Sequence, residues 1–522
     1  MNGAQIATID LAVIALYFAA IAGIAVYTTR SVETGDDLFL AGRSLRWPVV
    51  GGSLFASNIS STTLIGLAGA AYATGISVAN YEWMAGVVLV FMGVYVAPIY
   101  LRAKIGTIPE LLEKRFDRRS RLYFSALTIL LTVAVDTAGG IYAGAVVLRT
   151  FFPDLGLAET SAALALVAGL YTAAGGLKAV AFSDVLQAVV LIVGSALLTL
   201  IVFGEHGFSW SAATAETPDG HLSLIRPLDD PGVPWLGLVI GLPVLGFWYW
   251  AANQYVAQRL LGARTLRDAQ WGANLGGALK LLPLFIMVLP GAMAIGLFPD
   301  LEEADSVFPT LVAEMLPIGL TGLVLAGLIA AIMSSIDSTL NSSSTLIVKD
   351  FVEQPGRTLS PKRARLIGRA TTLTLMVVAA LWAPMIAEFG GLFSYLQQAF
   401  SVLAPPVTAV MLLGIFQRRG AGRAAFLTLL IGHALGAAFL AANLLGLWPL
   451  HYTITAGMMA FVSAALFLTL ARRDEEPSAE ALEGLIHAPK AHEDRDLPIL
   501  ARPRVQAAAI LAATAVIVAA FA

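Results

Sequence analysis

The residues best suited to bind an ion lie in a polar interruption of an otherwise apolar segment. Seven consecutive residues from Ser57 to Thr63, SNISSTT, include six polar side chains. Irregular backbone at membrane depth is tolerated only where it is buried in protein or lines a cavity. A helix broken here would offer carbonyl oxygens to a cation and N–H groups to a polar solute, as secondary transporters do. The stretch therefore predicts a cation-coupled carrier.

A second polar cluster lies at 326–345, AGLIAAIMSSIDSTLNSSST. Ala331, Ser334 and Ser335 stand at i, i+3 and i+4, so a helix would place them on one face. Two hydroxyls and the carbonyls of the broken helix would supply about five oxygens, the ligands that hard cations prefer. A single membrane serine more often bonds to its own helix or joins two helices. For the cluster together with the Asn58 break, we favour a cation site.

Two acids stand at or near membrane depth, where ionised groups cost several kcal/mol and are functional hypotheses by default. Asp337 follows Ser334 by three residues and could serve a second cation or a proton. Asp184 lies near the end of its apolar segment. Its alternative interpretation is a solvated helix terminus.

Lys280 is the only Lys or Arg well inside a predicted span. A buried, unpaired ammonium is untenable, so Lys280 needs an acceptor, and we predict Glu82. Snorkelling to the membrane edge is the disfavoured alternative. The amide of Gln397 could equally bind a solute or bridge helices. The mid-span aromatic run Trp248–Trp250 is suited to stacking on a sugar ring.

Composition limits the class of protein. The chain has 522 residues, of which 58% are hydrophobic and only 13% charged, as in a polytopic membrane protein. There is no cysteine, which excludes disulfides, thiolate catalysis and Cys-based metal sites. The first apolar run, Ile9 to Tyr27, is too long for a signal-peptide core and is interpreted as a membrane helix.

The apolar stretches predict an all-α fold with about fourteen membrane spans, since a span takes about 20 residues. The expected spans are 7–28, 47–73, 80–101, 122–150, 157–175, 179–203, 234–258, 271–297, 315–348, 370–388, 390–416, 424–446, 450–471 and 505–522.

The distribution of positive charge predicts orientation. With the first end outside, 29 of the 32 Lys and Arg residues fall in cytoplasmic segments, as the positive-inside rule requires. These segments are 29–46, 101–121, 175–185, 259–270, 349–369, 417–423 and 472–504. An even number of spans then places both termini outside.

The Asn58 break and the polar insert GFWYWAANQY at 246–255 each open a block of five spans, as an inverted repeat would. We therefore divide the chain into a leading helix with its connection, a first repeat, an external loop, a second repeat, two accessory helices, a cytoplasmic linker and a final helix. Their ranges are 1–46, 47–203, 204–233, 234–416, 417–471, 472–504 and 505–522.

Several motifs in matching order resemble the sodium–solute symporter family, specifically its sodium/glucose and bacterial sodium/galactose cotransporters. The resemblance covers about residues 35 to 420. It rests on DLFLAGRSLRWPVVGGSLFASNIS at 37–60, VANYEWM at 78–84, TIPELLEKRF at 107–116, GGLKAVAFSDVLQ at 175–187, NQYVAQRLL at 253–261, LKLLPLFIMVLPG at 279–291 and AAIMSSIDSTLNSSST at 330–345.

The resemblance implies a five-plus-five inverted repeat with broken first and sixth core helices, alternating access, and sodium-driven uptake of a neutral sugar or polyol. It places one sodium ion at the Ala56 and Ile59 carbonyls with Ala331, Ser334 and Ser335. A possible second sodium lies near Asp184, Asp337 and Ser338. The implied solute contacts are Asn58, Thr63, Glu82, Tyr249, Trp250, Lys280 and Gln397, and the implied gates are Tyr81, Tyr249 and Phe393.

Three positions depart from the sugar transporters, because Thr63, Gly246 and Ala85 stand where those proteins carry other hydrogen-bonding side chains. A bulkier sugar, an inositol or a sugar derivative is therefore a candidate solute. A symporter of an amino acid, nucleoside or carboxylate is the first alternative, and proton coupling through Asp337 is a variant mechanism. An intramembrane enzyme and a non-transporting sensor are remote alternatives. The bias to Arg over Lys and the many Ala residues suggest a GC-rich bacterial genome, and for a multi-pass protein we expect the bacterial inner membrane. The oligomeric state is left open.

Overall fold

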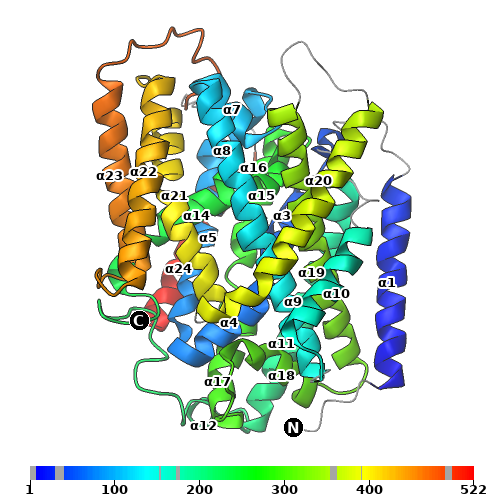
Figure 1. The fold of residues 1–522 in the computed structure, drawn as a ribbon. Helices are drawn as coiled ribbons and strands as arrows, with labels where there is room; N and C mark the ends of the chain where they lie inside the picture. Colours follow the sequence, from blue (N-terminus) through cyan, green and yellow to red (C-terminus); the bar gives the residue numbers. More distant parts are fainter. Residues whose placement is uncertain are drawn as a thin grey trace.

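The computed structural model describes residues 7–29, 40–151, 154–171, 177–352, 361–389, 391–487 and 497–522, and within them the chain is helical without β-strands (Figure 1). Eleven of these helices are long and apolar enough to cross a membrane, and a twelfth span results if the bent pair α3 and α4 counts as one. The prediction of an all-α polytopic membrane protein is confirmed.

The α-helices follow one another along the whole described chain. They are α1 Thr8–Thr29, α3 Trp47–Asn58, α4 Ser61–Thr74, α5 Asn80–Phe91, α6 Ala97–Arg102, α7 Ile108–Arg115, α8 Arg118–Leu131, α9 Ala138–Phe151, α10 Leu157–Tyr171, α11 Leu177–Glu205, α12 Trp210–Ala213, α13 Trp235–Ile240, α14 Leu242–Phe247, α15 Gln254–Leu261, α16 Leu266–Leu279, α17 Leu289–Leu297, α18 Val307–Met315, α19 Leu320–Leu346, α20 Pro361–Trp382, α21 Leu392–Phe416, α22 Gly422–Leu444, α23 Tyr452–Ala471 and α24 Pro503–Ala520.

Short helical segments of other pitch join or extend them. Five are π-helical, and π-turns within α-helices occur frequently at functional sites. They are η3 Met92–Val96, η4 Thr132–Thr137, η5 Trp248–Ala252, η6 Leu284–Val288 and η8 Ile347–Val352. The 3₁₀ segments are η1 Ala41–Arg43, η2 Ile76–Ala79, η7 Ala304–Ser306, η9 Ala383–Phe389 and η10 Ile499–Ala501.

The predicted break lies between α3 and α4, which are bent by 53°. Ile59 leaves the helical conformation with φ −79° and ψ 70°, and Ser60 is extended. Polar side chains take over backbone acceptors here: Ser57 Oγ donates to the Ser53 carbonyl at 2.5 Å, and Thr63 Oγ1 donates to the Asn58 carbonyl. Such bonds compete with the helix ladder, which explains why this polar run interrupts an apolar helix.

A second interruption follows η5. Asn253 adopts an extended conformation, with φ −70° and ψ 123°, and its side chain accepts a hydrogen bond from the Tyr255 N–H at 3.3 Å. This is the geometry of an N-cap residue that restarts a helix. The polar insert predicted at 246–255 therefore contains a helix break, and α15 is a new short helix.

Glycines bring α3 and α16 into close contact. A Cβ atom on Gly51 would lie 2.8 Å from the Gly272 carbonyl oxygen, and one on Gly272 would lie 2.6 Å from Val50 Cγ1. Small residues allow membrane helices to approach closely and pack through their backbones. This contact holds the broken helix against the helix that carries Lys280.

Gly272→Ala should destabilise the protein, because the added methyl group would lie only 2.6 Å from Val50 Cγ1 and 3.2 Å from the Trp47 carbonyl oxygen. Overpacking of this kind costs roughly 1–3 kcal/mol. Gly276→Ala is the matched control on the same helix, since its nearest neighbours would lie at ordinary contact distances of 3.5 Å or more. Thermal unfolding in detergent should show a lower melting temperature for Gly272→Ala only. Equal melting temperatures would contradict a tight α3–α16 contact.

Two buried acids anchor the helices that carry predicted site residues. Asp10 on α1 accepts from the Gly319 and Gly322 N–H groups at 2.7 and 2.8 Å, at the start of α19. Asp305 accepts from the Leu392 N–H at 2.9 Å, at the start of α21. Carboxylates at helix N-termini satisfy free N–H groups and the helix dipole. Burial raises the pKa of Asp305 above its usual value.

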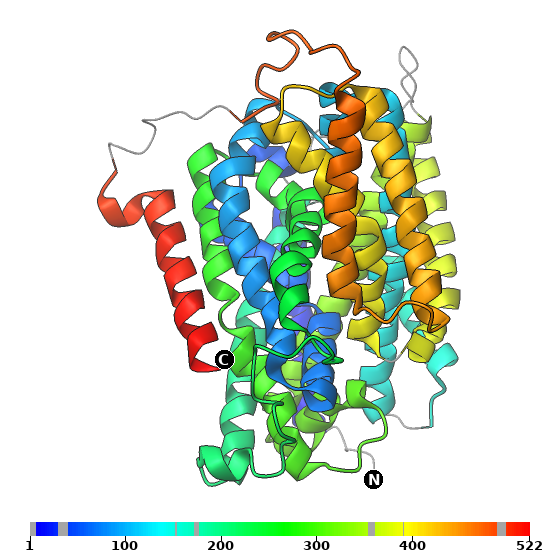
Figure 2. The ribbon, with the colours of Figure 1, turned by 90° about the vertical axis from the view of Figure 1, so that its left-hand side faces the viewer.

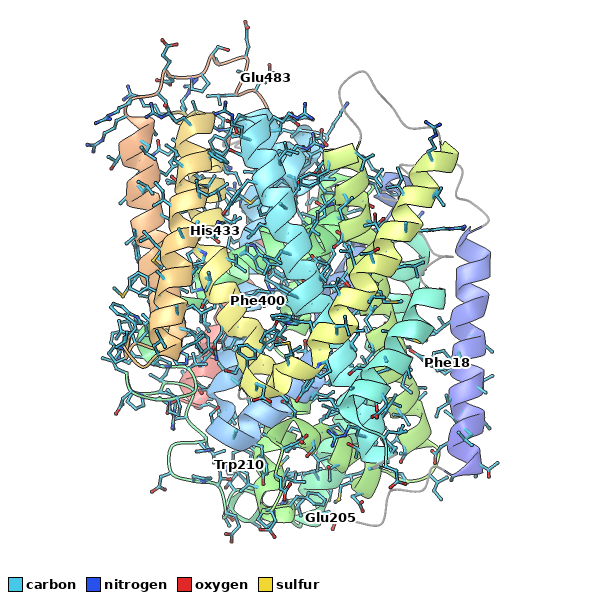
Figure 3. The ribbon with its side chains drawn as sticks, viewed as in Figure 1. Phe18, Glu205, Trp210, Phe400, His433 and Glu483 are labelled. Atoms are coloured by element: carbon cyan, nitrogen blue, oxygen red, sulfur yellow. The ribbon has the colours of Figure 1, made fainter. Side chains whose placement is uncertain are left out.

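Helices at the flanks complete the bundle. The final helix α24 packs on α16 and α5 (Figure 2), and α1 packs on α19 and α11 at another flank (Figure 1). The two ends of the molecule carry polar side chains such as Glu483 and Glu205, whereas Phe400 lies between them (Figure 3). α24 runs toward the end that holds the loop 204–233 (Figure 2).

Candidate solute and cation sites

One cavity, here called the main cavity, lies between the two interrupted helices. Eight of the predicted solute contacts and gates line this cavity, and they come from α3, α4, α5, η5 and α21. They are Asn58, Thr63, Tyr81, Glu82, Tyr249, Trp250, Phe393 and Gln397. The space open to the centre of a water molecule inside this cavity is about 100 Å³. One water needs only about 10–15 Å³ on this measure, so there is room for several waters or a small polar solute.

The predicted pair of Lys280 and Glu82 is formed. The ammonium lies 2.5 Å from Glu82 Oε2, donates to Asn58 Oδ1, and is wholly buried. The indole ring of Trp250 lies 5.2 Å from the ammonium, within the range of a cation–π contact. Snorkelling of Lys280 is excluded. Unlike the other predicted contacts, Lys280 stands behind the cavity wall, where it holds Glu82 and Asn58 in place.

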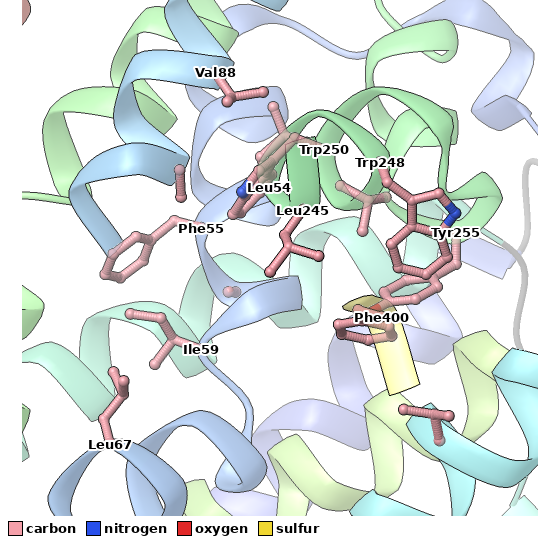
Figure 4. Packing of buried hydrophobic residues seen from close by; sticks show 14 of the residues in the cluster. Leu54, Phe55, Ile59, Leu67, Val88, Leu245, Trp248, Trp250, Tyr255 and Phe400 are labelled. Carbon is pink, nitrogen blue, oxygen red and sulfur yellow. The ribbon is translucent and has the colours of Figure 1, made fainter. Parts of the chain in front are cut away.

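Aromatic side chains form much of the remaining wall. Tyr249 shares a hydrogen bond with Tyr255 at 2.7 Å, and its ring lies 5.2 Å from Trp250 and 6.1 Å from Phe400. The rings of Trp248 and Phe400 pack with their centroids 4.7 Å apart (Figure 4), and of the two only Phe400 lines the cavity. The wall therefore presents flat apolar faces next to hydroxyl groups.

The predicted gate residues Tyr81 and Phe393 meet at the same cavity. Their rings are in edge-on contact with centroids 5.0 Å apart. Tyr81 is also held by the Tyr452 hydroxyl at 3.0 Å. α5, α21 and α23 are thus joined beside the cavity by three aromatic side chains.

A second, small cavity adjoins the main one. It has about 10 Å³ of room, which is enough for one water or one bare ion. Residues of both predicted sodium sets border it, and it is lined by Ala56, Ser57, Asp184, Gln187, Tyr255, Arg259, Ser335 and Ser338. Ser57, Tyr255 and Ser335 line both cavities.

The remaining predicted cation ligands are placed by their helices. Ala331 and Ser335 lie on the continuous helix α19, and Ile59 is buried at the α3 break. The last carbonyls of a helix have no partner within it. The Asn58 carbonyl accepts from Thr63, which leaves the carbonyls of Ala56 and Ile59 as the candidate ligands at the end of α3. The side chains of Ser334 and Asp337 lie outside the described part of the structure.

Asp184 is buried and bonded, so its interpretation as a solvated helix terminus is wrong. Its Oδ2 atom accepts from Ser53 Oγ at 2.8 Å and lies 3.3 Å from Arg259 Nη2. Arg259 is 1% exposed, although its sequence position predicts a cytoplasmic segment. The reason is the restart of the chain as α15 after Asn253, which keeps Arg259 inside the protein. Lys280 is therefore not the only buried cation.

Comparison with known proteins decides the family. Residues 38–432, three quarters of the chain, match the sodium:solute symporter family. The chain belongs to this family. Both the predicted resemblance and the assignment as a transporter rather than an enzyme are confirmed.

The symporter is similar in sequence to animal sugar cotransporters. It is 35% identical to sodium/glucose cotransporter 4 of Danio rerio over 466 aligned residues, covering 82% of this chain and 71% of that protein. It is 35% identical to sodium/glucose cotransporter 1 of Mus musculus, covering 82% and 70%. With a sodium/mannose cotransporter of Bos taurus the identity is 36%, covering 83% and 79%.

Solved structures share the symporter's fold. A Na⁺-coupled sialic acid symporter in a substrate-bound outward-open state aligns with a TM-score of 0.77 and 22% identity, over 91% of this chain and all of that one. Mhp1, a nucleobase-cation-symport-1 family transporter in a closed conformation, aligns with a TM-score of 0.56 and 16% identity, over 87% and 99%.

The three departures from sugar transporters have different surroundings in this symporter. Thr63, Gly246 and Ala85 all line the main cavity. A Cβ atom on Gly246 would lie 3.0 Å from Val88 Cγ2, so part of the room expected there is taken by Val88. The Thr63 hydroxyl is engaged with the Asn58 carbonyl, which makes it a support of the helix break.

Sequence reasoning missed one acid of the main cavity. Asp136 lies on η4 and lines the cavity. Its Oδ2 atom is buried and has no hydrogen-bond partner in the described part of the chain. The available signal was the single carboxylate in the middle of the span predicted at 122–150.

Proposed function

We propose that this symporter couples inward sodium movement to the uptake of a neutral sugar or polyol by alternating access. The observation that carries the proposal is the pair of adjoining cavities, one polar and aromatic, the other the size of one ion. They share the side chains of Ser57, Tyr255 and Ser335. A cation in one cavity would thus order groups that face a solute in the other. The sequence relatives are named as sodium/glucose and sodium/mannose cotransporters, which supports sodium as the coupling ion and a sugar as the solute.

The main cavity suits a neutral, hydroxyl-rich solute. Glu82 offers carboxylate oxygens, Asn58 and Gln397 carry amides, and Tyr249 and Trp250 offer faces to the C–H side of a ring. Because Lys280 is already paired with Glu82 and bonded to Asn58, it is not available as a free cation for an acidic solute. This disfavours a carboxylate cargo. A nucleoside, an amino acid or a sugar derivative remains the alternative.

The small cavity suits sodium, a hard cation that binds oxygen ligands. The proposed ligands of the main sodium ion are the Ala56 and Ile59 carbonyls with Ala331, Ser334 and Ser335. A second ion would use Asp184, Asp337 and Ser338. In the described arrangement Arg259 pairs with Asp184, so a sodium ion there competes with a guanidinium.

For the membrane layout we propose fourteen spans, with 47–203 and 234–416 as inverted repeats. Helices stand at all fourteen expected positions, and the two interruptions, at Ile59–Ser60 and Asn253, occur in the helices that open the two blocks. The excess of Lys and Arg then places both termini outside. A bacterial inner membrane is the proposed location, with the units before, between and after the repeats as divided above.

Uptake into proteoliposomes tests the function directly. We expect accumulation of one of galactose, glucose, mannose or inositol under an inward sodium gradient. An interior-negative potential of about 100 mV contributes about 2.3 kcal/mol per charge, or roughly fiftyfold accumulation per sodium ion. Unchanged uptake after replacing sodium by choline at fixed pH would refute sodium coupling. Sodium binding without uptake of any of these solutes would refute the cargo alone.

A further inference from the structure

Asp136 is the carboxylate of the main cavity that the proposed function does not use. It belongs to η4, a π-helical turn that packs against α19, the helix of Ser335. Its neighbour Thr137 donates to the Thr132 carbonyl at 2.7 Å and lies 2.9 Å from the Thr339 hydroxyl, so the turn is fixed to α19. Asp136 itself is directed to the cavity that Ser335 and Thr339 also line.

The charge of Asp136 is uncompensated in the described part of the chain. No ion pair to it is formed there, and Oδ2 has no hydrogen-bond donor. In contrast, Glu82 in the same cavity is neutralised by Lys280. Asp136 is half-buried, and a carboxylate at membrane depth whose buried oxygen has no partner is costly to hold as a bare anion. A neutral solute would displace water from it without supplying a counter-charge.

Oxygen atoms suited to a cation line the same cavity as Asp136. The hydroxyl-bearing residues Ser335, Thr339, Tyr249 and Tyr255 line the same cavity. A carboxylate with several neutral oxygens is a typical ligand set for a hard monovalent cation.

We propose that Asp136 is a separate monovalent-cation site inside the solute cavity, which takes a proton or a sodium ion and binds it more tightly when the solute is present. The proposal rests on the proposed function and extends it. The cation at Asp136 is distinct from the one in the small cavity, because Asp136 does not line that cavity. Solute and cation bind cooperatively here, because the solute displaces the water that solvates the bare carboxylate, and a bound cation neutralises that charge.

Few other titratable groups face Asp136. Within the cavity these are Glu82, held by Lys280, and the tyrosines Tyr81, Tyr249 and Tyr255. The described charged residues of α8, α9 and α20, which also pack on η4, lie toward their helix ends: Arg118, Arg119, Arg121, Arg149, Arg363 and Arg369. On α19 the side chain of Asp337 lies outside the described part. A pH effect on solute binding is therefore assigned by substitution at Asp136.

The test is solute binding and uptake by the full-length protein in proteoliposomes, with wild type, Asp136→Asn and Asp136→Glu. If the site takes a proton, wild-type solute affinity at saturating sodium falls by up to about tenfold for each unit of increasing pH, because the proton that favours solute binding is lost. If it takes sodium, the wild-type Hill coefficient for sodium exceeds that of Asp136→Asn, by up to one. Asp136→Asn should abolish the pH dependence or the extra sodium, and Asp136→Glu should keep it.

The proposal is overturned if Asp136→Asn has the same pH profile and the same sodium Hill coefficient as wild type. Should Asp136→Asn fail to fold, a wild type with no pH dependence and a Hill coefficient of one overturns it equally. Direct binding of radioactive sodium without solute separates the two proposals. Loss of one bound sodium in Asp136→Asn supports the site even if every tested sugar fails as cargo.

Discussion

Lys280→Met should reduce sodium-driven uptake at least about a hundredfold. The ammonium lies 2.5 Å from Glu82 and also bonds to Asn58, so its removal leaves a buried carboxylate unpaired and an amide without its donor. Breaking a buried pair from one side costs roughly 3–5 kcal/mol, and each 1.4 kcal/mol is tenfold in an equilibrium constant. Initial rates of solute uptake in proteoliposomes measure the loss.

Two further variants separate binding from folding in this prediction. Lys280→Met combined with Glu82→Gln removes both charges, so the folded protein should recover stability without recovering uptake. Lys114→Met is the matched lysine control. Lys114 pairs with Glu110 in a partly exposed ion pair, and neither residue lines either cavity. Full uptake by the Lys280→Met variant would show that the buried pair has no part in transport.

Ser335→Ala should raise the sodium concentration needed for half-maximal uptake by about tenfold or more. Its hydroxyl borders the small cavity, and hydrogen bonds or ligand contacts to a charge are worth roughly 1.5–3 kcal/mol. At saturating sodium, solute affinity should return close to the wild-type value, because the loss is in cation binding. Sodium titrations of uptake at fixed solute measure both quantities.

Ser342→Ala is the matched control for Ser335→Ala. Ser342 is a buried serine two turns further along the same helix and lines neither cavity. It should leave the sodium dependence unchanged. An equal sodium shift in both variants would mean that the helix, rather than the Ser335 hydroxyl, accounts for the effect.

Several features of the site could be predicted from the sequence because they depend on local chemistry. The polar run at Ser57–Thr63 predicted a helix break because such side chains compete for backbone bonds and are costly in lipid, and α3 ends there. The pairing of Lys280 with Glu82 followed from the cost of an unpaired buried charge, which leaves few acceptors along the chain. The periodicity of α19 likewise placed Ala331 and Ser335 on one face.

Other features depended on where helices begin again. Arg259 was assigned to a cytoplasmic segment by counting apolar residues, but the restart at Asn253 draws it into the core beside Asp184. Asp136 was passed over because one acid in an apolar stretch has no periodic pattern. Only the packing of η4 against α19 directs it to the main cavity. Gly246 looked like vacant room until Val88, from another helix, filled part of it.

The sequence by itself determined the membrane class, the helix breaks and the buried pair, because each follows from local composition or from the high cost of burying a charge. It also indicated the family, through the resemblance of several motifs in matching order. The tertiary structure alone decided that members of both predicted cation sets border one small cavity, and that Ser57, Tyr255 and Ser335 line both this cavity and the main one. These are relations between segments far apart in the chain. They arise from the packing of helices, which no single segment encodes.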